Sequence, residues 1–155
     1  ILNFRNMGSP QIKHTPASSI DEQFKNLDLV ENIEKHLAAS KNLSWDLKKL
    51  SSSDRGLYCE YLVYQKLLKE KFKFIAHRFK TPMAEIDLLF IDGSRAVAVE
   101  VKSNTSEAFL FTRVGRRQKT KLHAARLFLE SQYPEAQLLL AVVSHDASIE
   151  LFENF

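Results

Sequence analysis

Two short apolar runs joined by a tight turn constrain the fold of this chain most. Residues 84–91 and 96–102 are rich in apolar and β-branched residues, as buried strands are. Asp92 and Gly93 lie between the runs, and Asp-Gly is the strongest short signal for a β-hairpin. The sequence therefore predicts two neighbouring antiparallel strands at the centre of the fold.

Charged residues interrupt both apolar runs. They are Glu85, Asp87, Glu100 and Lys102. Because strand side chains alternate between faces, the two acids of the first run share a face, and so do the acid and the lysine of the second. If the hairpin pairs about its turn, these faces coincide. Buried charge needs compensation, so a divalent metal held by carboxylates, with the lysine beside it, explains the pattern. The alternative is a salt bridge between Lys102 and Asp87 at the sheet margin.

Length and composition limit the class of protein. The chain has 155 residues, 45% of them hydrophobic, which suits one domain with a substantial core. The net charge of +3 permits an anionic partner, and the single cysteine, Cys59, excludes an intramolecular disulfide framework. We find no run long enough to span a membrane, and residues 1–6 lack the features of a secretory signal. We therefore expect a cytoplasmic protein with no membrane partner.

The first third of the chain differs from the rest. Residues 1–18 show no helical or strand period and predict an arm with little structure of its own. A capping box at residues 19–22 begins an amphipathic helix predicted to reach residue 39, and a shorter helix is predicted near residues 45–50. A run of three serines then marks a break. We expect an N-terminal arm and helical extension over residues 1–53 and a second unit over 54–155.

A third predicted helix runs from about residue 55 to 71, with Asp54 as its N-cap. Glu60 lies at the edge of its apolar stripe, and periodicity alone favours a solvated boundary position for this residue. Residues 72–79 predict a strand that precedes the acidic hairpin.

A basic helix follows the hairpin, from about residue 116 to 132. Residues 113–126 hold six basic side chains and no acid. A helix N-terminus favours anions, so this charge either is tolerated in solvent or meets phosphate, and the sequence leaves both open. The basic residues that would meet phosphate are Arg113, Arg116, Arg117, Lys119 and Lys121. Residues 137–143 and 148–152 predict two final strands.

Residues 55–155 resemble the YraN-like family, a branch of the PD-(D/E)XK nuclease superfamily related to archaeal Holliday-junction resolvases. Four features in order carry the resemblance. They are Gly56 with Glu60, the run Glu85-Ile86-Asp87-Leu88-Leu89, the run Val99-Glu100-Val101-Lys102, and Arg117-Gln118-Lys119-Thr120-Lys121-Leu122 followed by Ala124-Ala125-Arg126. The resemblance implies an α/β fold with a mixed central β-sheet flanked by helices, a restriction-endonuclease-like core, to which residues 1–53 add a helical extension.

The resemblance also implies an activity, a cofactor and a partner. The activity is a Mg²⁺- or Mn²⁺-dependent endonuclease that hydrolyses DNA phosphodiesters, acting on branched or repair and recombination intermediates; a homodimer fits this class. The implied metal ligands are Asp87, Glu100, the backbone carbonyl of Val101, and Glu60 directly or through water. Lys102 would orient the attacking water or offset charge at phosphorus, and Gln118 would align Lys102 or a phosphate oxygen.

Two other classes of function fit the same residues. The first is a DNA-binding or competence and repair accessory protein that keeps the fold and the basic surface but cleaves nothing. The second is a protein-interaction domain in which the acids and Lys102 form a structural network. Metal binding distinguishes these readings, because only a metal site would lose Mn²⁺ binding on Asp87→Ala.

Overall fold

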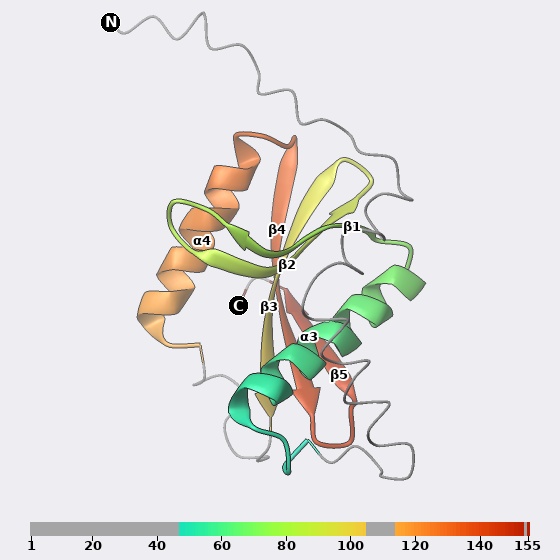
Figure 1. The fold of residues 1–155 in the computed structure, drawn as a ribbon. Coiled ribbons are helices and arrows are strands. Elements are labelled where there is room, and N and C mark those ends of the chain that lie inside the picture. Colours follow the sequence, from blue (N-terminus) through green and yellow to red (C-terminus); the bar gives the residue numbers. More distant parts are fainter. Residues whose placement is uncertain (1–46, 105–113, 154) are drawn as a thin grey trace, which may run out of the picture.

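A computed structural model describes residues 47–104, 114–153 and 155 of the chain. These residues form a five-stranded mixed sheet with one helix packed against each face (Figure 1). The elements in chain order are α3 (Ser52–Lys69), β1 (Lys73–Lys80), β2 (Glu85–Asp92), β3 (Arg95–Asn104), α4 (Arg116–Glu130), β4 (Glu135–Ser144) and β5 (Ile149–Glu153). Spatial order follows chain order; β3 and β4 are parallel and the other neighbours are antiparallel. This confirms the predicted fold class.

Helix α3 begins three residues before the start expected from the sequence. Ser51 is its N-cap, and the side chain accepts a hydrogen bond of 3.1 Å from the backbone N–H of Asp54. The prediction that Asp54 caps the helix was therefore wrong, because a serine three residues upstream satisfies the free N–H first. The buried residues recur at helical spacing, which fixes one face of α3 against the sheet. They are Cys59, Glu60, Val63, Tyr64 and Leu67.

The residues before α3 pack onto the same core. Leu47 is 1% exposed, and its carbonyl accepts a hydrogen bond of 2.7 Å from Arg55 Nε. Residues 47–50 form turns, so this part of the predicted short helix is not helical. The rest of that helix, the predicted helix over 20–39 and the arm over 1–18 lie outside the described residues. The division at residue 53 stays a prediction, although Leu47 already belongs to the core beneath α3.

The central hairpin forms as predicted. Asp92 pairs with Arg95, so the turn consists of Gly93 and Ser94. Gly93 has φ of 62°, a left-handed conformation that glycine adopts without steric cost. The predicted strands at 72–79, 137–143 and 148–152 appear as β1, β4 and β5, each displaced by three residues or fewer at its ends.

Two apolar layers enclose the sheet. On the α3 side, Tyr64, Phe74 and Phe90 pack edge-to-face or tilted, with ring centroids 5.0 to 6.4 Å apart. On the α4 side, small residues of β3 such as Ala96 and Ala98 let the helix approach, and Leu122 and Leu129 fill the space. The sheet is therefore buried on both faces, which explains its nearly continuous apolar strands.

The sheet forks between β2 and β3. Their backbone pairing runs from the turn only to the pair Leu88 and Val99. Beyond that point, among the strands that the structure describes, the start of β2 pairs only with β1 and the end of β3 pairs only with β4. Asp87 and Glu100 are the first residues past the last pair on each strand. The fork therefore opens at Asp87 and Glu100, two of the acids singled out from the sequence.

Candidate functional site at the fork of the sheet

Asp87 and Glu100 lie next to each other where the strands separate. Ala98 packs in the α4 layer, and Glu100 lies two residues beyond it on β3, so alternation turns Glu100 to the α4 side. Leu88 packs in the α3 layer, whereas Leu89 and Ile86 both pack in the α4 layer, so alternation along β2 is interrupted at Asp87. The backbone N–H of Val101 holds the Asp87 carboxylate at the fork. Glu85 lies at the start of β2, is exposed, and pairs opposite Lys80 instead.

The pKa of Asp87 is raised from 3.8 to about 7. Burial contributes most, and the carboxylate of Glu100 contributes next. The carboxylate of Glu60 raises it further, whereas the Val101 N–H and the Lys102 ammonium oppose the shift. The three predicted acids thus share one electrostatic environment, although Glu60 comes from α3 and the other two from the sheet.

Glu100 is the most buried of these acids, with 3% of the residue exposed. Its Oε1 lies 2.6 Å from Lys102 Nζ and accepts a hydrogen bond of 2.5 Å from Gln118 Nε2. Gln118 reaches it from the first turn of α4, so helix and strand meet at this carboxylate. The salt bridge considered between Lys102 and Asp87 is replaced by the one to Glu100, two residues away on the same strand.

Glu60 is buried, with 7% of the residue exposed, so its interpretation as a solvated boundary residue was wrong. Its Oε2 contacts His77 Nε2, and its Oε1 lies 3.5 Å from the guanidinium of Arg78. Both partners come from β1. Periodicity missed this burial because it describes the helix alone, and the strand that covers the edge of α3 arrives from elsewhere in the chain.

The donor atoms at the fork suit a hard divalent cation. Within the described ranges, each of the two sheet carboxylates has one oxygen engaged by the chain: Oδ2 of Asp87 by the Val101 N–H, and Oε1 of Glu100 by two donors. The second oxygen of each remains for another ligand. No three His, Cys, Asp or Glu side chains of residues 47–104, 114–153 and 155 are grouped to hold a metal ion together. The ligand set of Asp87, Glu100, Val101 and Glu60 therefore stays a prediction.

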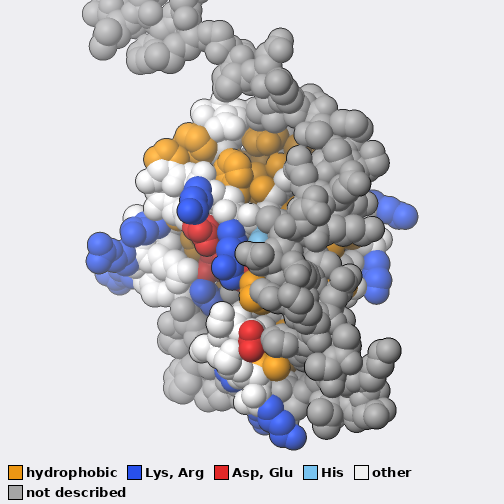
Figure 2. All heavy atoms as spheres, in the orientation of Figure 1, with side chains coloured by type: hydrophobic (Ala, Val, Ile, Leu, Met, Phe, Trp, Pro, Cys, Tyr) orange, Lys and Arg blue, Asp and Glu red, His pale blue; other side chains and the backbone are white. Residues whose placement is uncertain are grey.

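Basic side chains surround the fork. Arg116, Arg117, Lys119 and Lys121 are all exposed on the first turns of α4, beside the inward-facing Gln118. Gly115 is the N-cap and provides no side-chain hydrogen bond, and the first turn holds no acid. Figure 2 shows Asp and Glu side chains near the middle of the visible face, bordered by Lys and Arg. Arg113, the remaining predicted DNA contact, lies outside the described residues.

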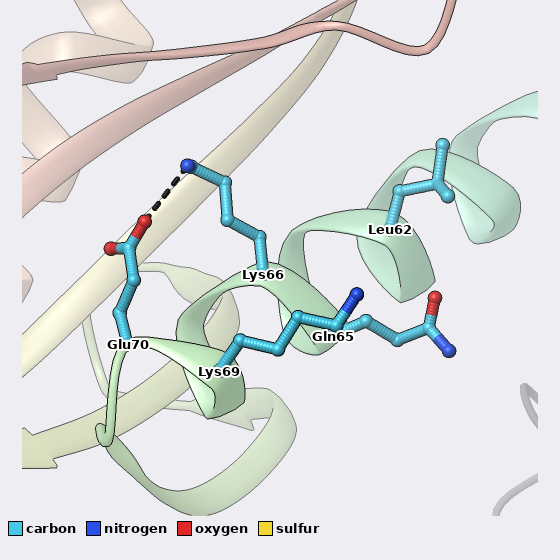
Figure 3. Close-up of a pocket in the computed structure, with 5 residues that line it drawn as sticks. All are labelled: Leu62, Gln65, Lys66, Lys69 and Glu70. Carbon is cyan, nitrogen blue, oxygen red and sulfur yellow. Dashed lines mark ion pairs between the residues drawn. The ribbon is translucent and has the colours of Figure 1, made fainter.

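A separate hollow of about 320 Å³ lies on the outer side of α3 (Figure 3). Lys66 and Glu70 form an ion pair of 2.8 Å beside it. It is lined by Leu62, Gln65, Lys66, Lys69 and Glu70. Leu62, Gln65 and Lys69 lie about 140–180° around the helix from Glu60, on the opposite side of α3. This hollow is therefore not part of the site at the fork.

A family model for uncharacterised protein family UPF0102 matches residues 59–146. The chain belongs to this family. The match confirms the resemblance to the YraN-like family, and it contains Glu60, Asp87, Glu100, Lys102 and Gln118. The description of this family names no activity, so the chemistry of the protein has to follow from its site.

Three relatives illustrate how far UPF0102 similarity extends. A UPF0102 protein of Colwellia psychrerythraea is 40% identical over 62 residues, which are 40% of this chain and 48% of that relative. One from Thermodesulfovibrio yellowstonii is 33% identical over 101 residues, 61% of this chain and 88% of that protein. One from Rhizobium etli is 34% identical over 85 residues, 54% and 70% of the two chains. The chain thus spans about half the length of the first relative and most of the other two.

Sequence analysis missed two residues of the site, His77 and Arg78. The strand that carries them was predicted, but nothing in its pattern indicated which face each side chain takes.

Within the described residues, neither helix is long and apolar enough to cross a membrane. The expected cytoplasmic location and the homodimer stay predictions.

Proposed function

We propose that this UPF0102 protein is a Mg²⁺- or Mn²⁺-dependent endonuclease that hydrolyses DNA phosphodiester bonds. The observation that carries the proposal is the grouping of carboxylates at the fork, where burial and the charges of Glu100 and Glu60 raise the pKa of Asp87 to about 7. A protein that had no use for this negative charge would gain stability by replacing it. A cation held among the carboxylates would offset it and keep Asp87 ionised at neutral pH.

The ligands of the ion would be Asp87, Glu100, the carbonyl of Val101 and Glu60. When bound, Mg²⁺ or Mn²⁺ would polarise the phosphate and lower the pKa of a coordinated water. Lys102 is half-buried, and its ammonium is already fixed beside Glu100. This position allows it to orient the water or to offset charge as the phosphorus centre becomes pentacoordinate. Gln118 holds Glu100 in place and brings the start of α4 to the fork.

The substrate class follows from the charge around the fork. The exposed basic residues of α4 lie beside Gln118, which contacts the site directly. Phosphate groups of a nucleic acid backbone are suitable partners for a helix start that has no acid and no side-chain cap. Such contacts carry no base specificity, so the proposal includes DNA of any sequence.

A second candidate is a DNA-binding accessory protein that does not cleave. The contacts that the acids already make within the protein favour this candidate. Lys102 and Gln118 contact Glu100, and His77 and Arg78 contact Glu60. In this reading the network is structural, and the basic surface alone carries the function.

A cleavage assay tests the proposal. Purified protein would be incubated with labelled linear duplex, branched and single-stranded DNA in Mg²⁺, Mn²⁺ or EDTA. We expect cleavage of at least one substrate with metal and none with EDTA, and loss of cleavage on Glu100→Ala. Glu85→Gln, which removes an exposed charge from the same hairpin, serves as the control and should cut normally. DNA binding without metal-dependent cleavage in any condition would favour the accessory protein.

A further inference from the structure

Two of the described residues, His77 and Arg78, contact the carboxylate of Glu60, and they differ sharply in burial. The side chain of His77 is 7% exposed and contacts Oε2, whereas that of Arg78 is 47% exposed and lies 3.5 Å from Oε1. A contact between two buried side chains fixes a carboxylate, because neither side chain can replace it with a hydrogen bond to water. A longer contact from an exposed guanidinium is easily exchanged. Glu60 therefore has one oxygen held firmly and one held loosely.

The backbone of β1 departs from regular geometry on both sides of His77. A register shift between Phe74 and Ala76 marks a bulge before it, and Arg78 directly after it has φ of 51°. Phe74 packs in the α3 layer, and regular alternation would send Ala76 and not His77 to that side. After the bulge, His77 pairs with Leu88, which also packs in the α3 layer. The bulge is thus what turns His77 toward Glu60.

Arg78 occupies a strained position at a specific place. A left-handed φ is unfavourable for a residue with a Cβ, and such residues concentrate where surrounding structure requires them. The pairs His77 with Leu88 and Phe79 with Ile86 put Arg78 across from Asp87 on the neighbouring strand. Its cation therefore lies at the fork, at one oxygen of Glu60 and on the strand beside Asp87.

We propose that His77 is a positioning residue that holds Oε2 of Glu60, and that Arg78 is the chain's own counter-ion, which a divalent cation displaces from Oε1. The inference rests on the proposed function, because it takes Glu60 as a ligand of the ion. It assigns the two partners of Glu60 opposite effects on metal affinity. His77 favours binding by fixing the ligand before the ion arrives, and Arg78 opposes binding by competing for the same carboxylate.

The first arm of the test is a calorimetric Mn²⁺ titration without DNA. His77→Phe keeps a ring of similar size but cannot donate to Glu60, so we expect Mn²⁺ affinity to fall about tenfold, as for other residues that orient a ligand. His77→Gln retains an N–H donor on a side chain of similar reach, and we expect it to recover most of the affinity. Thermal unfolding without metal, measured in parallel, reports the structural cost of each change.

The second arm uses Arg78, whose exposed side chain can be changed with little risk to folding. Arg78→Asn removes the cation and places at φ of 51° a residue that tolerates this conformation. We expect Mn²⁺ to bind severalfold more tightly. Arg78→Lys keeps the charge and serves as the matched control, with affinity close to that of the parent chain.

Each outcome has a distinct meaning. Mn²⁺ binding by the parent chain with opposite effects of His77→Phe and Arg78→Asn supports the inference. Binding that neither variant changes, with only thermal stability altered, overturns it and leaves the proposed function intact. If His77→Phe does not fold, His77→Gln still reports on the positioning role of His77. Mn²⁺ affinity of Arg78→Asn that is equal to or weaker than that of the parent chain overturns the proposal that the cation displaces Arg78. Absence of Mn²⁺ binding by the parent chain, with Asp87→Ala behaving identically, overturns both the inference and the proposed function.

Discussion

The backbone N–H of Val101 donates a hydrogen bond of 2.8 Å to Oδ2 of Asp87, across the point where β2 and β3 separate. If the antiparallel pairing of β2 and β3 continued past this point, a backbone carbonyl of β2 would accept the hydrogen bond from a β3 N–H. A buried N–H needs a partner, and the carboxylate supplies one where the ladder ends at Leu88 and Val99. One side chain thus both completes the fork and carries the negative charge of the candidate site.

The raised pKa of Asp87 predicts a specific pH dependence of stability. Its folded value of about 7 exceeds the ordinary 3.8, so the folded protein binds this proton more tightly than the unfolded chain. Stability should therefore rise as pH falls through 7 toward 4, and should be lost as pH rises through 7. Asp87→Asn, which can still accept from Val101, removes the ionisation. In metal-free buffer we expect the variant to be more stable than the parent at pH 9 and similar at pH 5.

Urea unfolding at pH 5, 7 and 9 with EDTA measures this effect. Glu85→Gln removes an exposed carboxylate from the same strand and should not reproduce the gain at pH 9. A loss of stability in Asp87→Asn at every pH would show that the carboxylate is worth more to the fork as a hydrogen-bond acceptor than it costs as a buried charge.

Lys102→Ala should separate catalysis from metal binding. Lysine is not a ligand, so the variant should still bind Mn²⁺ while cleaving no DNA. Glu100, buried beside it, loses its only ion pair among the described residues, which we expect to destabilise the metal-free protein by about 1–3 kcal/mol. Added Mn²⁺ should then stabilise the variant more than the parent chain. Thermal unfolding with and without Mn²⁺ measures this difference. If Lys102→Ala lost Mn²⁺ binding and cleavage equally, the role of Lys102 would be to maintain the structure of the site.

Much of the fold could be predicted because its signals are local. The Asp-Gly turn, the apolar runs on each side and the helical periods of α3 and α4 depend on neighbouring residues, and the structure reproduces them. The position of Asp87 across from Glu100 also follows from local rules, since the two-residue turn sets the register of the hairpin. The hairpin could therefore be read almost completely from the sequence.

Contacts between distant segments could not be predicted in the same way. The burial of Glu60 depends on β1, and the face taken by His77 depends on a bulge that no residue type in the strand announces. The cap of α3 was missed for a related reason, because Ser51, Ser52, Ser53 and Asp54 are all good caps and only the start of the helix selects one. Sequence patterns identified the charged groups, but not the partners that hold them.

Leu47 tests whether the segment before residue 53 belongs to the core. It is 1% exposed beneath α3, so Leu47→Ala should reduce the free energy of unfolding by about 2–5 kcal/mol through lost burial and the cavity left behind. Leu127→Ala is the matched control, because this leucine is 57% exposed on α4 and its truncation should change stability by no more than about 0.5 kcal/mol. Urea unfolding compares them, and equal effects would place the domain boundary after Leu47.

The salt dependence of DNA binding tests the basic surface of α4. Each phosphate contact releases counterions, so removing two contacts should flatten the slope of log affinity against log salt by about 1.8 units on duplex DNA. We expect this from Arg116→Ala/Arg117→Ala, with a similar loss for every sequence tested. Lys66→Ala/Lys69→Ala removes the same charge from the outer side of α3 and should leave the slope nearly unchanged.

Glu100→Ala completes this comparison, because it should act in the opposite direction. Without metal, the substitution deletes a negative charge near the expected phosphate path and leaves Lys102 without its counter-ion. Repulsion of the DNA backbone decreases, so binding should be at least as tight as that of the parent chain while no strand is cut with Mg²⁺. Weaker binding in EDTA would mean that DNA does not approach the fork. An unchanged slope for the double arginine variant would remove α4 from the binding surface and place the contacts on other basic residues.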